Sequence, residues 1–275
     1  MREARAGLLL AAWVLGVGCR EDKPVEPLTS LAPAPLAPLT AERMDAGAGD
    51  AGAGDDPLFR VAPAPVYGEP VPDKALRLEL AGESVRLAGE TFTPVRPAEL
   101  AKLAERIQGQ AVLVVPDADT FMAQTSELFE ALRDGASQVW LKHPDAAVAY
   151  RLVLRDEEGF RAWLAEVAPG KLRIIQRADG LELSTSVGKL PGGDPNGPSV
   201  PVRGGKQDIA TLRRGLERLK GRFKTAEDIC LVPSFGTEVA QAARALSGIY
   251  TAPGEPLFES LCLIYPTPPR RKDGG

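Results

Sequence analysis

The sequence predicts an α+β fold built from two tandem units of order β-β-α-β-α-β, each a small mixed sheet with helices packed on one face. Three observations support this prediction. Apolar residues follow a fixed order of strand-like and helix-like periods over residues 74–144. The same order recurs over residues 169–266. Matching residues also follow the buried strand of each unit, and shared order with shared positions favours a duplication over chance similarity.

The matched positions lie just after the expected buried strands. Thr120 follows the first of these strands and Thr237 follows the second, each at the same distance from a Val-Pro pair. An Ala-Gln pair then follows each threonine, again at the same spacing. The two units are therefore aligned through these turns.

In the first unit, apolar and polar residues alternate on either side of Gly82, which predicts a hairpin. A continuous apolar run is typical of a buried strand. Asp119 and Thr120 are expected to cap the second helix. The expected elements are strands at 76–80 and 85–87, a helix at 100–107, a strand at 111–115, a helix at 121–132 and a strand at 139–141.

In the second unit, a hairpin is expected around Asp179-Gly180, because this dipeptide favours tight turns between strands. The helices are indicated by apolar residues that recur on one helical face. The expected elements are strands at 172–175 and 181–183, a helix at 209–219, a strand at 229–232, a helix at 239–246 and a strand at 260–264.

Residues 145–168 fall outside the repeat. A strand-like pattern runs over 148–154, and a helix is expected after it, with Asp156 as its cap and Trp163 on its apolar face. Two roles remain open for this segment: it connects the two units, or it packs on one of them.

Residues 1–18 have the layout of a cleaved export signal. Arg2 and Arg5 precede an apolar stretch that is too short to span the roughly 30 Å of hydrocarbon in a bilayer. Cys19 follows directly, so the segment resembles a bacterial lipoprotein signal and implies lipid on Cys19, although Gly16 stands where such signals favour Leu. An ordinary secretory signal with an incidental cysteine is the alternative. Because no later run reaches 18 apolar residues, membrane attachment is expected to rest on this lipid.

Residues 19–73 are expected to form a lipidated, disordered tether, and residues 267–275 a disordered tail. Ala-Pro tracts favour extended chain, and the Asp-Gly run at 45–56 stays solvated. This run lacks the pattern of a calcium-binding EF-hand loop, so no metal site is expected. An extended tether would reach on the order of 100 Å.

Two cysteines, Cys230 and Cys262, fall in the middle of expected strands that flank one helix. A β-α-β crossover makes such strands parallel and allows them to be neighbours. A disulfide between them is one reading, which suits an oxidising compartment. The other is two buried thiols that act as small apolar groups, and the apolar counterparts Leu113 and Trp140 in the first unit favour it.

Composition excludes several classes of function. A net charge of −4 does not indicate the basic surface that nucleic-acid binding needs. The chain has one histidine, His143, which excludes a metal site built from several histidines. The Gly-rich loop over 188–206 matches no nucleotide-binding motif. No cofactor is expected.

The strongest catalytic candidates are His143 with Asp145, and Asp117 with Asp119 as a carboxylate pair. In the alignment of the two units, however, His143 matches Tyr265, which indicates a surface residue at a strand end. Asp119 matches a glycine, which suits a turn. We therefore expect no enzyme.

The first unit resembles the periplasmic domain of the ExbD/TolR family through LRLELAGESVRLAGE, PAELAKLAERI and AVLVVPDADTFMAQTSELFEALRDGASQVWL. Asp117 matches an Asp that the family usually has after the third strand. The second unit matches more weakly, with Ser234 at this position. Family members have an N-terminal transmembrane helix where this chain has a lipoprotein-like signal, so the family's proton-coupled activity is not implied.

What the resemblance implies is dimerisation and contact with peptidoglycan or envelope proteins. We therefore expect a lipid-anchored periplasmic binding or scaffold protein that contacts peptidoglycan or an ExbD/TolR-type transport or motility complex, at the outer rather than the inner membrane. An envelope enzyme acting on cell-wall material is the alternative. The partner-binding candidates lie in the turns after the buried strands and are Asp117, Asp119, Thr120 and Thr237.

Overall fold

The computed structural model describes residues 64–166 and 171–267. The predicted signal, the lipidation site Cys19, the tether up to residue 63 and all of the predicted tail except Thr267 lie outside the described residues. Among the described residues, no helix has both the length and the apolar character needed to cross a membrane.

The helices are α1 (Pro97–Ile107), α2 (Ser126–Gly135), α3 (Glu157–Ala165), α4 (Ile209–Arg222) and α5 (Val239–Leu246), with short 3₁₀ turns η2 (Met122–Gln124) and η3 (Ser247–Ile249). The strands are β1 (Glu69–Pro70), β2 (Leu76–Ala81), β3 (Ser84–Leu87), β4 (Glu90–Phe92), β5 (Ala111–Val115), β6 (Gln138–Lys142), β7 (Val148–Arg155), β8 (Leu172–Arg177), β9 (Gly180–Thr185), β10 (Gly188–Lys189), β11 (Val200–Pro201), β12 (Asp228–Val232), β13 (Tyr250–Ala252), β14 (Glu255–Pro256) and β15 (Ser260–Ile264).

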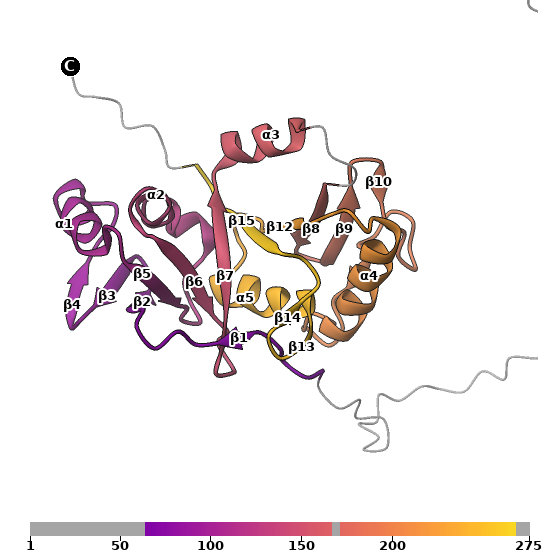
Figure 1. Ribbon diagram of the computed structural model, residues 1–275, viewed down its shortest axis with the longest axis horizontal. Coiled ribbons are helices and arrows are strands. Elements are labelled where there is room, and N and C mark those ends of the chain that lie inside the picture. The colour runs from indigo at the N-terminus through magenta and orange to yellow at the C-terminus, as the bar shows by residue number, and fades with distance from the viewer. Residues whose placement is uncertain (1–63, 167–170, 268–275) are drawn as a thin grey trace, which may run out of the picture. The chain divides into compact units, whose positions relative to one another are not determined.

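The fold is α+β, but the expectation of two separate small sheets is wrong. In the part of the chain that the structure describes, 13 strands form one mixed sheet of order β10-β9-β8-β12-β15-β7-β6-β5-β2-β3-β4, with β1 beside β7 and β11 beside β9 (Figure 1). Strand β7 pairs antiparallel with β6 of the first repeat and parallel with β15 of the second. Separate sheets would have left β6 and β15 as unpaired edges, whereas β7 satisfies the backbone groups of both.

The ladder register is the same in the two repeats at aligned positions. Leu78 pairs with Val114 between β2 and β5, and Ile174 pairs with Leu231 between β8 and β12. The next parallel strands follow in the same way, β6 beside β5 and β15 beside β12. The repeats therefore lie in one sheet with opposite strand directions, on either side of β7.

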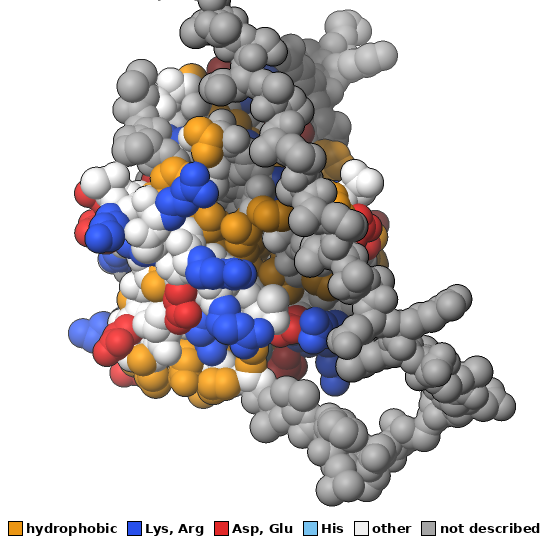
Figure 2. All heavy atoms as spheres, turned by 90° about the vertical axis from the view of Figure 1, so that its right-hand side faces the viewer, with side chains coloured by type: hydrophobic (Ala, Val, Ile, Leu, Met, Phe, Trp, Pro, Cys, Tyr) orange, Lys and Arg blue, Asp and Glu red, His pale blue; other side chains and the backbone are white. Residues whose placement is uncertain are grey.

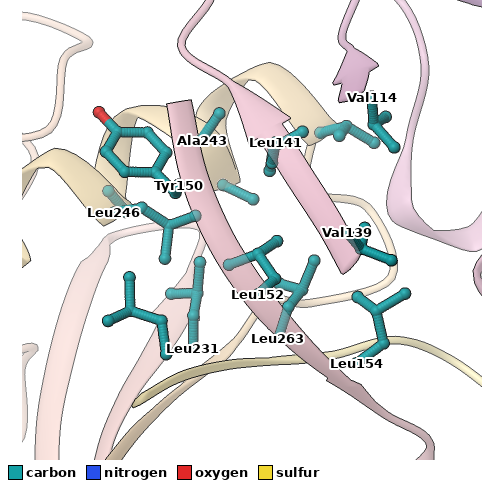
Figure 3. Close-up of a cluster of buried hydrophobic side chains, with 14 of the residues drawn as sticks. Val114, Val139, Leu141, Tyr150, Leu152, Leu154, Leu231, Ala243, Leu246 and Leu263 are labelled. Atoms are coloured by element: carbon teal, nitrogen blue, oxygen red, sulfur yellow. The ribbon is translucent and has the colours of Figure 1, made fainter. Parts of the chain in front are cut away.

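One face of the sheet carries the helices that belong to the repeats. Apolar residues of α1, α2, α4 and α5 pack with inward-facing strand residues in a single core cluster. Figure 3 shows that this core continues across β7: Leu141 from the first repeat and Leu263 from the second lie around Tyr150 and Leu152 of β7. The repeats share one core and are not two independently packed units.

The opposite face is covered differently. Alternate strand residues point to this side, and α3 packs on those of the second repeat through Trp163. The indole N–H of Trp163 donates to Asp228 of β12, and the ammonium of Lys171 lies 4.6 Å from the Trp163 ring centroid. Asp156 caps α3 as expected, accepting a 2.7 Å hydrogen bond from the Gly159 N–H. The segment outside the repeat thus contributes both the central strand and a cover.

The folded part begins earlier than the sequence predicts, since residues 64–73 belong to it. Strand β1 pairs antiparallel with β7. The Tyr150 hydroxyl donates to the Tyr67 carbonyl at 3.1 Å, and the Arg213 guanidinium lies 4.5 Å from the Tyr67 ring centroid. A side chain at Gly68 would meet the Tyr150 ring, which explains why glycine suits this close approach. The described chain therefore enters the fold along its central strand.

Cys230 and Cys262 are joined in a disulfide between β12 and β15. The two strands are parallel neighbours, as expected, and the cysteines occupy directly paired positions with a Cα–Cα distance of 4.4 Å. The preference for two free thiols is therefore wrong. The apolar counterparts in the first repeat indicate correctly that both positions are buried, but burial alone does not distinguish a disulfide from thiols.

Replacing both Cys230 and Cys262 with Ala should lower the free energy of unfolding by about 3–4 kcal/mol, because the disulfide closes a loop between residues 32 positions apart. Urea unfolding of the two proteins measures the difference. Peptide mass spectrometry without reduction should recover the linked Cys230–Cys262 peptide. Labelling of both thiols in denatured, unreduced protein would contradict the disulfide.

Candidate functional site

The turns after β5 and β12 meet at the junction of the two repeats. Met122 N–H donates to the Thr237 carbonyl at 2.8 Å, and Val239 N–H donates to the Thr120 carbonyl at 2.9 Å. These bonds are reciprocal, because Thr120 corresponds to Thr237 and Met122 to Val239 under the repeat alignment. The junction is thus a pseudo-symmetric backbone contact that complements the pairing through β7.

Thr120 and Thr237, which the sequence indicates as partner-binding candidates, are buried in this junction at 1% and 5% exposure. Thr120 Oγ1 donates to the Gly82 carbonyl at 3.3 Å, and Thr237 Oγ1 lies 2.8 Å from the Ser234 hydroxyl. Their side chains face other parts of the fold. In this structure both side chains help to hold the turns in place, and Thr237 also lines a cavity beside the junction.

Asp117 connects the turn after β5 to the β2–β3 hairpin. Its carboxylate accepts hydrogen bonds from the Thr120 N–H at 2.8 Å and from the Gly82 N–H at 2.9 Å. Burial by itself raises the pKa of Asp117, but the hydrogen bonds from Thr120 and Gly82 outweigh it and hold the pKa below the usual range. The ionised carboxylate therefore acts as an internal clamp.

Asp119 is exposed and does not cap a helix. The helix expected from residue 121 begins later, as α2 at Ser126, after the 3₁₀ turn η2. Phe121 is displaced from the expected apolar face because its backbone bridges to Glu238 at the repeat junction. Among the four partner-binding candidates, Asp119 is the one with an exposed side chain.

His143 lies at the end of β6 but is buried at 3% exposure, so the expectation of a surface position is wrong. Its counterpart Tyr265 is also buried. The Asp145 N–H donates to His143 Nδ1 at 3.1 Å. Burial, together with the cations Arg244 and Lys142, lowers the pKa of His143 although Asp145 acts in the opposite direction, so the imidazole is neutral at pH 7.

A cavity of about 860 Å³ opens beside the junction, on the side of the second repeat. Its volume is within the range of sites that hold small organic ligands. It lies between the β8–β9 turn, the chain before α4, the turn after β12 and the first turns of α5. It is lined by Asp145, Arg177, Ala178, Val202, Gly205, Lys206, Gln207, Ile209, Ser234, Gly236, Thr237, Gln241 and Arg244.

The charges at this cavity are mainly positive. Arg177 pairs with Asp179 and Glu182 at 2.9 and 3.3 Å, and Arg244 pairs with Asp145 at 2.8 Å. These pairs are largely exposed and are therefore weak.

Among the described residues, no carboxylate forms an ion pair with the Lys206 ammonium. Figure 2 views the molecule from the side of α4 and β10, where Lys and Arg side chains gather among apolar ones. Helix α4 contributes several of these Lys and Arg residues, since its sequence is IATLRRGLERLKGR.

The cavity has the groups to bind an organic anion: an unpaired ammonium, two guanidinium groups, hydroxyls at Ser234 and Thr237, and apolar wall at Val202 and Ile209. His143 does not line it. Among the described residues, no group of three or more His, Cys, Asp or Glu side chains is arranged to hold a metal ion.

Sequence reasoning missed Arg177, Lys206 and Arg244 as site residues. Lys206 ends the Gly-rich loop over 188–206, whose sequence matches no nucleotide-binding motif. Aligning the repeats beyond the buried strands would have pointed to the other two, because Arg244 stands where the first repeat has Glu127 and Arg177 where it has Ala81.

A scan against protein-family models finds no match to this chain, and a search of the curated proteins finds no relative.

Replacing Asp117 with Asn should lower the free energy of unfolding by about 1–2 kcal/mol at pH 7, because a charged acceptor of two backbone N–H groups becomes neutral. A folded-state pKa below the unfolded value of about 3.9 gives stability that is present above that value and lost as pH falls through the folded pKa. Urea unfolding at several pH values should therefore show the stabilities of the two proteins converging as the pH falls below the unfolded pKa of about 3.9.

The matched control is Asp119→Asn, two residues away and exposed. Its free energy of unfolding should stay within about 0.5 kcal/mol of the natural protein. An Asp117→Asn protein as stable as this control would show that the clamp contributes nothing.

Proposed function

We propose that this protein is a lipid-anchored binding protein of the bacterial cell envelope. Lipid on Cys19 holds it at a membrane, with the outer membrane favoured, and the chain up to residue 63 carries the folded part into the periplasm. The folded part acts by binding, without chemical conversion of its ligand. Its partner is peptidoglycan or a protein complex of the ExbD/TolR type, and a homodimer is compatible with this role.

The cavity at the repeat junction is the observation that carries the binding function. Cations, hydroxyls and apolar groups line one open space, which suits recognition of an organic anion. General base catalysis requires a titratable group within reach of the substrate. The one histidine is buried outside the cavity, and its Nδ1 already accepts a backbone hydrogen bond. Asp145 does line the cavity, but its carboxylate is paired with the Arg244 guanidinium at 2.8 Å. This arrangement favours binding over the alternative of a cell-wall enzyme.

Two further features support the envelope as the place of action. A disulfide such as Cys230–Cys262 is typical of proteins in oxidising compartments, including the bacterial periplasm. Residues 1–19 have the layout of a lipoprotein signal. Because the two features arise in unrelated parts of the chain, they support the same compartment independently.

Replacing Cys19 with Ser should move the full chain from the membrane fraction to the soluble periplasmic fraction, since lipid on this residue is the proposed attachment. Immunoblotting of fractionated cells measures the distribution, with Cys230→Ala/Cys262→Ala as a control that keeps Cys19. A Cys19→Ser protein that stays membrane-bound in high salt would refute the lipid anchor.

Deleting residues 24–58 should abolish function in the cell while leaving the folded part intact, because a tether matters through its reach. The deletion stops short of Tyr67 and β1, which pack on the fold. An unrelated flexible sequence of equal length should restore function. The readout is recovery of cross-linked envelope partners from whole cells. Equal recovery with and without residues 24–58 would contradict the tether.

A further inference from the structure

The two repeats differ at the point where the cavity opens. In the first repeat, the Asp117 carboxylate lies between the Gly82 N–H of the hairpin and the Thr120 N–H of the turn after β5. Strand register makes Ala178 the counterpart of Gly82. The counterpart of Asp117 is Ser234, whose hydroxyl is turned to Thr237 at 2.8 Å.

The second repeat therefore lacks the carboxylate that closes the first. Among the described residues, no side chain accepts a hydrogen bond from the Ala178 N–H, and both Ala178 and Ser234 line the cavity. The open space lies where the first repeat has the Asp117 clamp.

Charge differences between equivalent positions point in the same direction. Four positions at this place are more positive in the second repeat than in the first. The pairs, first repeat then second, are Ala81 and Arg177, Asp117 and Ser234, Asp119 and Gly236, and Glu127 and Arg244. Lys206, from the loop before α4, adds an ammonium without a carboxylate partner. The second repeat thus has a serine in place of the Asp117 carboxylate and more cationic side chains around that position; the one carboxylate among the lining residues, Asp145, is paired with Arg244 at 2.8 Å.

We infer that this cavity binds the terminal carboxylate of a short peptide, which supplies from outside the group that Asp117 supplies within the first repeat. One carboxylate oxygen accepts from the Ala178 N–H, as an Asp117 oxygen accepts from Gly82. Lys206, which lines the same cavity, provides positive charge. This inference rests on the proposed binding function and names the chemistry of its ligand.

The rest of the cavity indicates what carries the carboxylate. About 860 Å³ is far more than a bare carboxylate fills, and Val202 and Ile209 supply apolar wall. A chain of small residues that ends in a carboxylate fits both properties. Such an end occurs in the stem peptides of the cell wall and at protein C-termini, and the stereochemistry of the terminal residues distinguishes these two sources.

The test uses the full chain purified in detergent and isothermal titration. The probes are N-acetyl-dialanine in its L,L and D,D forms, the C-terminal amide of each, and inorganic phosphate, at up to about 10 mM. The acids should bind at least about tenfold more tightly than the matching amides, because the amide removes the charge and keeps the shape. Tighter binding of the D,D acid would assign the ligand to cell-wall peptides, and tighter binding of the L,L acid to protein termini; equal binding supports the carboxylate alone.

Two variants locate the site. Ser234→Asp places a carboxylate where the first repeat has Asp117, so it should weaken binding of the acids at least about tenfold by occupying the position itself. Ser186→Asp, which adds the same charge at an exposed residue outside the cavity lining, should leave the affinity within about twofold. Lys206→Gln should weaken the acids several-fold and leave the amides unchanged.

Several results would overturn the inference: no binding of any probe, amides that bind as tightly as acids, phosphate that binds as tightly as the acids, or a Ser234→Asp protein with unchanged affinity. Partner capture from cross-linked envelopes separates this failure from that of the proposed function. A chain that captures its partner but binds no carboxylate would refute only the carboxylate site.

Discussion

The pairing of β7 with both β6 and β15 is the interaction on which the rest of the structure depends. It joins two repeats that would otherwise each expose an edge strand, and it brings their helices onto one face over a single core. The same pairing brings the turns after β5 and β12 close enough for their reciprocal backbone bonds. The cavity beside that junction is lined by residues of the second repeat together with Asp145, which lies between β6 and β7.

Most of the local structure could be predicted from the sequence, because alternation and helical period report directly on burial. The strands from Ala111, Asp228 and Ser260 and the cap at Asp156 illustrate this success. The single sheet could not be predicted, since the strand pattern of β7 is the same whether it packs on one unit or joins two. The burial of His143 could not be predicted either, because the position of a residue at the end of a strand does not say which other segments cover it.

The candidate site was predictable only in part. Its place in the turn after a buried strand predicted Asp117 as a partner-binding residue, but in the structure its carboxylate joins two turns of the first repeat. The cavity residues Arg177 and Arg244 come from segments far apart in the sequence, and their significance depends on comparison with the equivalent residues of the other repeat. The two repeats can therefore be compared position by position: the first has a carboxylate that joins its hairpin to the turn after β5, and the second has Ser234 at the equivalent position.

The place where the chain enters the fold has a mechanical consequence. Strand β1 is only two residues long, and it lies against the central strand with Tyr67 as its neighbouring contact. If the N-terminal side is fixed to a membrane, any pulling force on the folded part is transmitted first through this short pairing. Neighbouring contacts share this load, because the Gly254 N–H donates to the Gly68 carbonyl at 2.9 Å and Val71 and Ala75 pack on Leu113 and Trp140. A pull from the N-terminal side would therefore load this entry segment, with its hydrogen bonds and its packing, before it loads β2 and the rest of the sheet.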